Sequence, residues 1–386
     1  MITLHNIHII KEGLKDVICN NGKITSISTA DKENNSNGAH FYFDNALAFP
    51  GLINSHDHLD FDLFPMLGNR IYKNYLEWGD DIHRQNKKII DEILSVPKEL
   101  RIQWGIYKNL LNGITTVFNH GKKLKINDAI IDVFKDKNAL HSVRLEKNWR
   151  LKLNNPFNNK EPYVIHVGEG TDDNSCKEID ELIKWNKLNK KLIGIHGVAM
   201  NVAQAHSFQA LIWCPDSNFF LLDKTAAINE LKKNTAILFG TDSTVSSDWN
   251  CWNQLRLGRK TGLLNDEELF ASITTAPAKT RRLNDTGILR ESSNADVIIA
   301  EKKYDNEMNS FFAVNPESIL MIIKNGNIIL FDESLLTQFN AQKKDISTFN
   351  RISINGRFKY VKGNINHLIK QIKEFSKDIS IPVEPA

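Results

Sequence analysis

Short apolar runs alternate with helical patterns between residues 49 and 289, and this alternation constrains the fold more than any other feature of the sequence. The runs that predict buried strands are AFPGLINSH, GITTVFNH, LHSVRL, PYVIHVG, LIGIHG, ALIWCP and AILFGTDS. Stretches such as KELRIQWGIYKNLLNG lie between them and have apolar residues at the three-to-four spacing of a helix. Because strands alternate with helices, we expect an α/β fold, a TIM-like (β/α)8 barrel of parallel strands.

These runs are one strand short of the eight that such a barrel contains. The stretch 146–162 (EKNWRLKLNNPFNNKEP) is polar and short, and we expect a degenerate or shortened element there. The chain between Arg144 and His166 is also shorter than a full pair of strand–helix units requires. The sequence thus predicts a barrel with one degenerate strand.

Both ends of the chain contain alternating apolar segments that are typical of antiparallel strands. The segment ITLHNIHII lies near the start, and ILMIIKNGNIILF near the end contains an Asn-Gly pair that predicts a hairpin. Each half has too few strands to bury a core alone. We therefore expect residues 1–48 and 290–335 to form one composite β-sandwich domain, residues 49–289 to form the barrel, and residues 336–386 to form a helical C-terminal tail.

Composition narrows the choice of partner and compartment. The 49 basic and 46 acidic residues nearly balance, which argues against nucleic acid or an anionic membrane as partner. No apolar run approaches the ~20 residues of a membrane span. The segment MITLHNIHIIKEG lacks the apolar core of a signal peptide, so we expect a cytoplasmic protein. The expected partner is a small-molecule substrate, and the sequence leaves open whether the chain forms a homo-oligomer.

The four cysteines are far apart and contain no CxxC pair. This pattern favours neither a disulfide framework nor a thiolate zinc site, so we expect reduced and mostly buried thiols.

Ligand-type residues stand at the carboxyl ends of four predicted strands, where barrel enzymes place their active sites. His56 and His58 follow the run PGLIN, and a spacing of two on an extended strand points both imidazoles to one face. A lone His-x-His motif is weak evidence because surface histidine pairs are common. The other strand ends add His166, with Glu169 three residues later, then His196 and Asp242. Together these positions predict a catalytic metal site.

The segments PGLINSHDHL, GITTV, HVGE, IHG, WCPDSN, GTDS and the run from ASITTAPAKTRRL to the ADVII strand resemble the amidohydrolase superfamily, in particular its cytosine/guanine deaminase and triazine hydrolase branch. The resemblance covers nearly the whole chain. It implies one divalent metal ion, Zn or Fe. It also assigns the ligands His56, His58, His166 and Asp242, a proton shuttle at Glu169, and a second catalytic residue at His196.

The chemistry of these residues agrees with that assignment. Three imidazoles and a carboxylate suit Zn²⁺ or Fe²⁺, whereas Mg²⁺ and Ca²⁺ prefer more oxygen ligands. A bound ion lowers the pKa of water toward about 7. In this scheme Asp242 takes the proton of the water, Glu169 protonates a ring nitrogen of the substrate, and His196 orients the water or stabilises an oxyanion.

Several further residues are candidate substrate contacts, although each could simply pack or face solvent. Trp213 replaces the histidine that many relatives have before the Cys-Pro pair, while Ser217 and Asn218 match the family turn. Arg70 and Trp78 lie in the stretch after the first barrel strand, and His120 ends the second predicted strand. Asp57, between the two histidines of the motif, is read as an outward-facing or supporting carboxylate.

Three functional hypotheses follow. The first is hydrolytic deamination of a small aminated heterocycle such as a purine, pyrimidine, pterin or triazine. The second is ring-opening hydrolysis of a cyclic amide, as in imidazolonepropionase. The third is a catalytically silent binding protein on the same fold, but the complete set of ligands and proton-transfer residues favours an enzyme. A binuclear site bridged by a modified Lys147 or Lys152 is a further alternative, which the His-x-x-Glu pattern disfavours.

Overall fold

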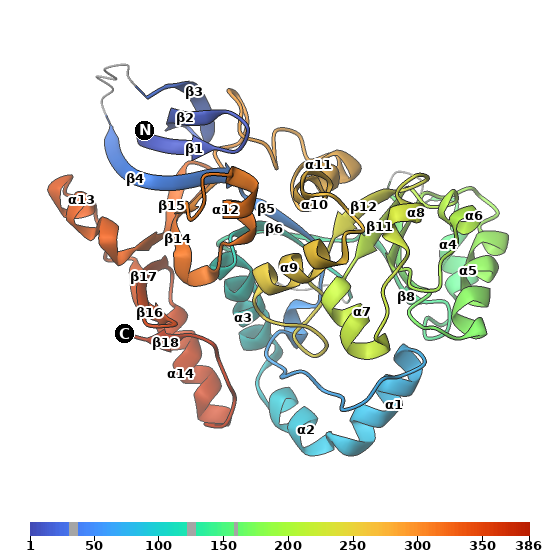
Figure 1. Cartoon of the computed structure of the whole chain (residues 1–386). Helices are drawn as coiled ribbons and strands as arrows, with labels where there is room; N and C mark the ends of the chain where they lie inside the picture. Colours follow the sequence, from blue (N-terminus) through green and yellow to red (C-terminus); the bar gives the residue numbers. More distant parts are fainter. Residues whose placement is uncertain (31–37, 122–128, 158–160) are drawn as a thin grey trace.

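The computed structural model describes residues 1–30, 38–121, 129–157 and 161–386. These residues form a ten-stranded sheet at one side of the molecule and a set of parallel strands with surrounding helices at the other (Figure 1). Within the described residues, no helix has both the length and the apolar character needed to cross a membrane. All four cysteines are free, and three of them are buried, as expected.

The ten-stranded sheet combines both ends of the chain, in the order β18-β16-β17-β15-β14-β13-β4-β1-β2-β3. Its central joint is the antiparallel pair β4–β13, which connects the N-terminal strands to the C-terminal ones. Its strands are β1 (Ile2–Ile9), β2 (Gly13–Asn20), β3 (Lys23–Thr29), β4 (Ala39–Pro50), β13 (Val297–Glu301), β14 (Ile319–Lys324), β15 (Asn327–Asp332), β16 (Phe349–Ile354), β17 (Arg357–Lys362) and β18 (Glu384–Pro385).

Two details of this sheet bear on the sequence-based expectations. The predicted hairpin forms between β14 and β15, where Asn325 and Gly326 both have positive φ, as a tight two-residue turn requires. The strands belong to one continuous hydrogen-bonded sheet, not to two separately paired ones as the term sandwich implied.

The C-terminal tail differs from the expected helical segment. Residues 336–386 contain two helices, but they also supply β16, β17 and β18 to the large sheet. The alternation in FNRISI and RFKYVK carries this strand signal, because the residues that alternate inward, such as Ile352, Ile354 and Val361, are fully buried. The domain boundaries remain predictions.

The parallel strands form two groups, β12-β11-β10-β9-β8 and β5-β6-β7. Their bounds are β5 (Leu52–Asp57), β6 (Ile114–Asn119), β7 (Asp132–Lys135), β8 (Asn138–Ser142), β9 (Tyr163–Val167), β10 (Leu192–His196), β11 (Ala210–Trp213) and β12 (Ala236–Phe239). The end of β12 adjoins β5, because the Asp242 N–H donates a hydrogen bond of 3.1 Å to the carbonyl of His56.

The irregular part of this strand arrangement lies elsewhere than expected. Residues 146–162 contribute only the short helix α4 (Trp149–Leu153) among their described positions. The additional strand is β7, which pairs in parallel with β6, while β8 pairs in parallel with β9. Only two residues separate β7 from β8, too few for the crossover that neighbouring parallel strands require. The two strands are therefore successive parts of one extended segment that leads from one group of strands to the other.

Most helices lie around these strands, and the first three follow β5, whereas the last two helices of the chain lie beside the ten-stranded sheet (Figure 1). The helices are α1 (Tyr75–Gln85), α2 (Lys87–Ser95), α3 (Lys98–Leu111), α5 (Asp173–Trp185), α6 (Val202–Ala205), α7 (Pro215–Leu222), α8 (Ile228–Leu231), α9 (Cys251–Thr261), α10 (Asp266–Ser272), α11 (Thr275–Arg281), α12 (Glu307–Phe312), α13 (Leu336–Ala341) and α14 (Ile365–Phe375), with 3₁₀ turns at Leu59–Phe61, Pro316–Ser318 and Glu333–Leu335.

The segment before α1 crosses the carboxyl ends of the strands. The Leu67 N–H bonds to the carbonyl of Val245, and the Tyr72 N–H bonds to the carbonyl of Leu221. Asn74 caps α1 by accepting hydrogen bonds from the first turn. Helices α1 and α2 are thereby held beside the strand ends that carry the histidines.

Candidate functional site

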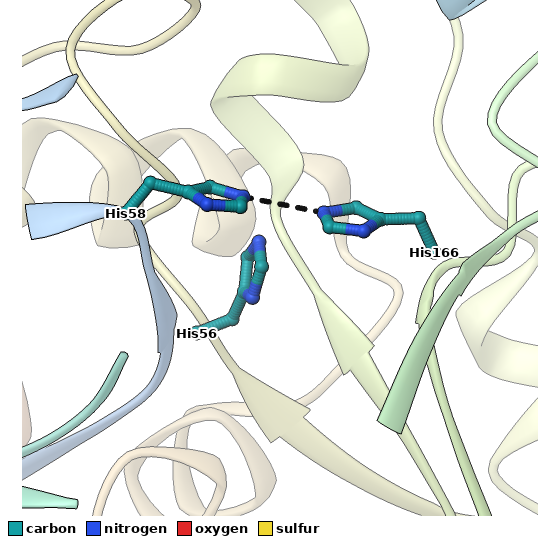
Figure 2. Close-up of side chains that lie close together, drawn as sticks. All are labelled: His56, His58 and His166. Atoms are coloured by element: carbon teal, nitrogen blue, oxygen red, sulfur yellow. Dashed lines mark hydrogen bonds between the residues drawn. The ribbon is translucent and has the colours of Figure 1, made fainter. Parts of the chain in front are cut away.

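Three histidine side chains from two strands converge at the carboxyl ends of the parallel strands (Figure 2). His56 and His58 lie on β5 and directly after it, and His166 lies on β9. Both ring nitrogens of His56 are buried and have no hydrogen-bond partner among the residues that the structure describes. A buried polar atom without a partner is costly, so these nitrogens call for a ligand such as a metal ion.

The ring of His166 is oriented toward His58. Its Nδ1 lies 2.9 Å from the carbonyl oxygen of His141, and because a carbonyl only accepts, Nδ1 carries the hydrogen. The lone pair of Nε2 therefore points to His58 Nε2, 3.4 Å away (Figure 2). A tetrahedral ion with nitrogen ligands at about 2.1 Å holds those ligands about 3.4 Å apart. The two imidazoles thus have the spacing of ligands to one ion.

Asp242 completes this cluster from the end of β12. Its Oδ1 lies 3.7 Å from His56 Nε2 and 3.9 Å from His58 Nε2. The Ser217 hydroxyl donates to Oδ2 at 2.9 Å, and the Ser243 N–H donates to Oδ1 at 2.8 Å. Asp242 also has a φ of 55°, a left-handed conformation that is uncommon outside functional sites and tight turns.

Electrostatics favour the protonation states that metal binding needs. Burial, followed by the charges of neighbouring histidines, lowers the pKa of His58 and of His166 well below the ordinary value, so both rings are neutral. Burial alone would raise the pKa of Asp242, but the surrounding imidazoles, His56 foremost, hold it well below its usual range. Neutral imidazoles and an ionised carboxylate are the ligand forms of these side chains.

His196 adjoins the cluster and is held by Asn218. Its Nδ1 lies 2.9 Å from Asn218 Oδ1, while the Asn218 amide nitrogen donates to Thr225 at 3.2 Å. This pairing places the ring hydrogen on Nδ1 and leaves a lone pair on Nε2. That atom lies 3.6 Å from Glu169 Oε2 and 3.9 Å from Asp242 Oδ2. Burial lowers the pKa of His196 to about 4, so the ring is neutral.

Glu169 follows β9 and faces the same space. Its carboxyl group is buried, and burial together with the charges of Asp242 and Glu178 raises its pKa well above the ordinary value. A carboxyl group that retains its proton near neutral pH can act as a general acid.

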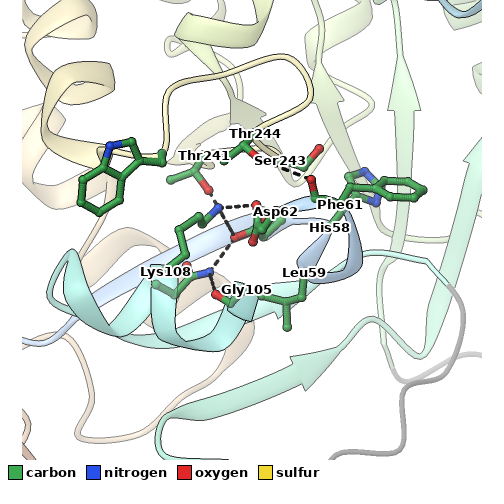
Figure 3. A network of polar contacts seen from close by, with 12 residues as sticks. His58, Leu59, Phe61, Asp62, Gly105, Lys108, Thr241, Ser243 and Thr244 are labelled. Atoms are coloured by element: carbon green, nitrogen blue, oxygen red, sulfur yellow. Dashed lines mark hydrogen bonds and ion pairs between the residues drawn. The ribbon is translucent and has the colours of Figure 1, made fainter. Parts of the chain in front are cut away.

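A buried polar network lies behind β5, the strand that carries His56 (Figure 3). Asp57 points to the face of β5 opposite its neighbouring histidines, as alternation along a strand requires, and it is fully buried. Its Oδ2 accepts hydrogen bonds from Lys108 Nζ at 3.0 Å and from Asn109 Nδ2 at 2.7 Å. Lys108 Nζ also donates to Asp62 Oδ1 at 2.6 Å. Asp57 is therefore a supporting carboxylate and not an outward-facing one.

Five of the six residues named as candidate substrate contacts lie outside the cavity wall. Ser217 and Asn218 contact Asp242 and His196 instead of open space, as described above. Trp213 is fully buried, and its indole N–H donates to Thr225. Arg70 is exposed and pairs with Glu77 at 2.6 Å. His120 is buried, with Nδ1 3.7 Å from Asp136 Oδ2.

A cavity of about 460 Å³ opens above the cluster. His58, His166, Glu169, His196 and Asp242 line its inner end. Helices α1 and α2 form a wall of this cavity. The sequence predicted only one residue of that wall, Trp78, as a possible substrate contact. The missed signal was the apolar stripe at four-residue spacing in α1 and α2.

The two lysines considered for a binuclear site do not join the cluster. Lys147 and Lys152 have exposed side chains, and Lys152 forms an ion pair with Glu146. Neither lines the cavity. Two overlapping groups of described residues could hold an ion: His56–His58–His166 and His56–His196–Asp242. Within each group the donor atoms lie within 4.8 Å of one another. Because the groups share His56, they fit one ion.

Comparisons with known proteins relate part of the sequence to a family and the whole fold to solved structures. Residues 157–329 match the model of the amidohydrolase family. No curated protein matches the sequence. Among solved structures, an adenosine deaminase from Xanthomonas campestris with bound zinc has a TM-score of 0.71 at 13% identity, covering 98% of both chains.

Two further structures share the fold. The atrazine chlorohydrolase TrzN from Arthrobacter aurescens TC1, complexed with zinc, has a TM-score of 0.65 at 15% identity, covering 97% of this chain and 100% of that one. The guanine deaminase from C. acetobutylicum, with bound guanine, has a TM-score of 0.63 at 15% identity, covering 84% of this chain and 99% of that one. At such low identity these likenesses establish the fold. Together with the family match over residues 157–329, they show that the chain is similar in fold to the amidohydrolase superfamily.

Proposed function

We propose that this protein hydrolyses a C–N bond in a small aminated heterocycle, most simply by deamination. The observation that carries the proposal is that two proton-transfer groups, Glu169 and His196, adjoin a complete set of metal ligands at the inner end of one cavity. An adenosine deaminase and a guanine deaminase share this fold, and they support the same reaction class.

The proposed ligands are His56, His58, His166 and Asp242. A divalent ion at these ligands, Zn²⁺ or Fe²⁺, makes water acidic enough to serve as a nucleophile near neutral pH. The buried Asp242 carboxylate lies where it can accept a proton, and its Oδ2 also accepts from Ser217. Ser217 therefore fixes the orientation of the carboxylate.

Glu169 is the proposed proton shuttle. Its side chain faces the cavity and is not needed to complete the ligand set. It can deliver a proton to the ring nitrogen beside the attacked carbon and later return one to the departing amine.

His196 is proposed to orient the attacking water. Because Nδ1–H is committed to Asn218, the Nε2 atom that faces Asp242 and Glu169 is an acceptor. An acceptor holds a water hydrogen but cannot stabilise an oxyanion, so of the two roles expected from the sequence we favour the first.

The test is the identity of the product. Metal-loaded protein should be incubated with purines, pyrimidines, pterins and triazines that carry an amino group, with cyclic amides as a matched panel. Deamination releases one ammonia per turnover and exchanges the amino group for oxygen. Product that has gained the elements of water without ammonia release would instead establish ring opening. Binding of these compounds by metal-loaded protein without any turnover would establish the silent binding protein.

A further inference from the structure

The cavity is divided into a polar inner end and an apolar outer part. Most side chains that can hydrogen-bond or ionise gather at the inner end, in the cluster described above. The exceptions are the exposed His83 and His141, together with Tyr75 and Trp78. The outer wall is formed mainly by apolar side chains, among them Phe64, Trp78, Ile82, Ile90, Leu94 and Leu145.

The helices build this wall through their sequence spacing. Trp78 and Ile82 are four residues apart on α1, and Ile90 and Leu94 are four residues apart on α2. Residues at this spacing lie on one face of a helix. Each helix therefore presents a pair of large apolar side chains to the cavity.

Apart from the exposed imidazoles of His83 and His141, the polar side chains of the outer wall are already bonded within the protein. The Tyr75 hydroxyl donates to Ser142 Oγ at 2.8 Å. The Trp78 indole N–H donates to the carbonyl of Leu67 at 2.6 Å. Both residues thus present their rings, and not a free donor, to whatever fills this part of the cavity.

Charged groups are also missing from this wall. Among the residues that the structure describes, no lysine or arginine lines the cavity. The nearby Arg70 pairs with Glu77, and Arg144 lies 3.4 Å from Glu178. A carboxylate or phosphate placed against the apolar side chains would lose its hydration without gaining a lysine or arginine partner, which is unfavourable. Only the exposed imidazoles of His83 and His141 could hydrogen-bond to it.

Apolar side chains remain exposed around this part of the cavity. Phe61 is 39% exposed, Leu94 48% and Leu145 52%, and all three line the cavity. An apolar ligand group would remove their surfaces from water, which stabilises the complex.

Resting on the proposed function, we propose that the substrate is an aminated heterocycle bearing an uncharged apolar substituent, such as an aryl or branched alkyl group, remote from its amino group. The amino-bearing carbon faces the polar cluster, and the substituent packs against α1, α2 and Leu145. A volume of about 460 Å³ suits a heterocycle with such a group. Heterocycles that carry a ribosyl, carboxylate or phosphate group are disfavoured by this wall.

The experiment compares three matched sets of compounds. Adenine, cytosine and melamine are each supplied unsubstituted, with a benzyl group and with a carboxymethyl group at one ring or exocyclic nitrogen remote from the reacting amino group. Binding is measured by calorimetry to metal-loaded Glu169→Gln protein, and ammonia release is measured with the unmodified protein. In at least one set we expect the benzyl compound to bind about ten-fold or more tightly than the unsubstituted one, and the carboxymethyl compound to bind most weakly.

A charge placed in the wall should reverse this preference. Leu94→Arg should weaken benzyl binding by about ten-fold and strengthen carboxymethyl binding. Ile89→Arg is the matched control, because Ile89 is on the same helix, is 37% exposed and does not line this cavity. If Leu94→Arg protein does not fold, Leu145→Arg takes its place, with the exposed Leu151→Arg as its control.

The outcomes separate this inference from the proposed function. Benzyl compounds that bind no better than the unsubstituted ones in all three sets, or carboxymethyl compounds that bind best, would overturn the inference. Tight benzyl binding without ammonia release from any compound would leave the inference standing and remove deamination. Ammonia release without a preference for benzyl compounds would support deamination and overturn the inference about the apolar substituent.

Discussion

Lys108 and Asp57 form a buried ion pair, with Nζ 3.0 Å from Oδ2, directly behind the strand that carries the two histidines of the His-x-His motif. The same ammonium group lies 2.6 Å from Asp62 Oδ1 (Figure 3). Asp57 stands between His56 and His58, so its side chain fixes the strand that presents both rings.

Lys108→Met should therefore disturb both stability and metal binding. It leaves two buried carboxylates without their cation, a change that costs about 3–5 kcal/mol. Metal affinity should fall about 10- to 100-fold, the usual result of losing an outer support of the ligands. Lys87→Met, which removes an exposed pair with Asp91, is the control and should change neither quantity appreciably. Denaturant unfolding and metal titration provide the measurements; unchanged affinity in Lys108→Met would show that the network is only structural.

One transition-metal ion per chain is the second expectation. The ligand set is complete for one ion, and neither Lys147 nor Lys152 adjoins it. Elemental analysis of protein purified without chelator should give about one equivalent of Zn or Fe, and removing it should lower the melting temperature. Two equivalents together with a modified lysine would contradict the single-ion site.

Glu169 separates proton transfer from metal binding. Glu169→Gln keeps the shape of the side chain but removes its titrating group, so metal content should stay the same while turnover falls about 10²-fold or more. Asp242→Asn should reduce both metal content and turnover, because it removes the charge of a ligand. Metal analysis and ammonia release distinguish the two variants. Loss of metal or normal turnover in Glu169→Gln would show that Glu169 is not the proton shuttle. His196 would then be the next candidate for the general acid.

Stability should depend on pH through Glu178. Burial raises the pKa of this carboxyl group from 4.5 to about 7, against the opposing Gly168 N–H and Arg144. The folded state therefore binds a proton more tightly than the unfolded state, so the contribution of Glu178 to stability decreases as pH rises from about 4.5 to 7. Glu178→Gln imitates the neutral form and should be more stable than the unmodified protein above pH 7, by up to about 3 kcal/mol. Unfolding curves from pH 5 to 8 measure this difference; a constant difference across that range would refute it.

The composite sheet predicts the effect of truncation. Removing residues 1–45 deletes β1, β2, β3 and about half of β4. The rest of β4 stays paired with β13, but it loses its partner β1, so its edge and the adjoining apolar core are exposed. We expect insoluble protein, since an uncovered apolar strand edge promotes aggregation. Removing only residues 384–386, which form a short exposed edge strand, should leave the protein soluble. A soluble, metal-loaded protein lacking residues 1–45 would show that the two halves of the sheet are independent.

The sequence by itself predicted much of the proposed metal site. His56, His58, His166 and Asp242 could be found because each follows a short buried strand, and parallel strands bring their carboxyl ends together. The same local signals predicted the hairpin at Asn325 and the joining of the two chain ends in one sheet, because those features depend on turn chemistry and on the burial of alternating residues.

Only the tertiary structure decided the features that depend on distant partners. The merging of β7 with β8 follows from pairing with β6 and β9, and the short strands of the tail form because β15 offers an edge. The Nδ1–H tautomer of His196 comes from Asn218, 22 residues away. The apolar wall from α1 and α2 depends on where the loop before α1 crosses the strand ends. Local patterns cannot specify such contacts, because the energy of each depends on atoms that the chain brings together only when it folds.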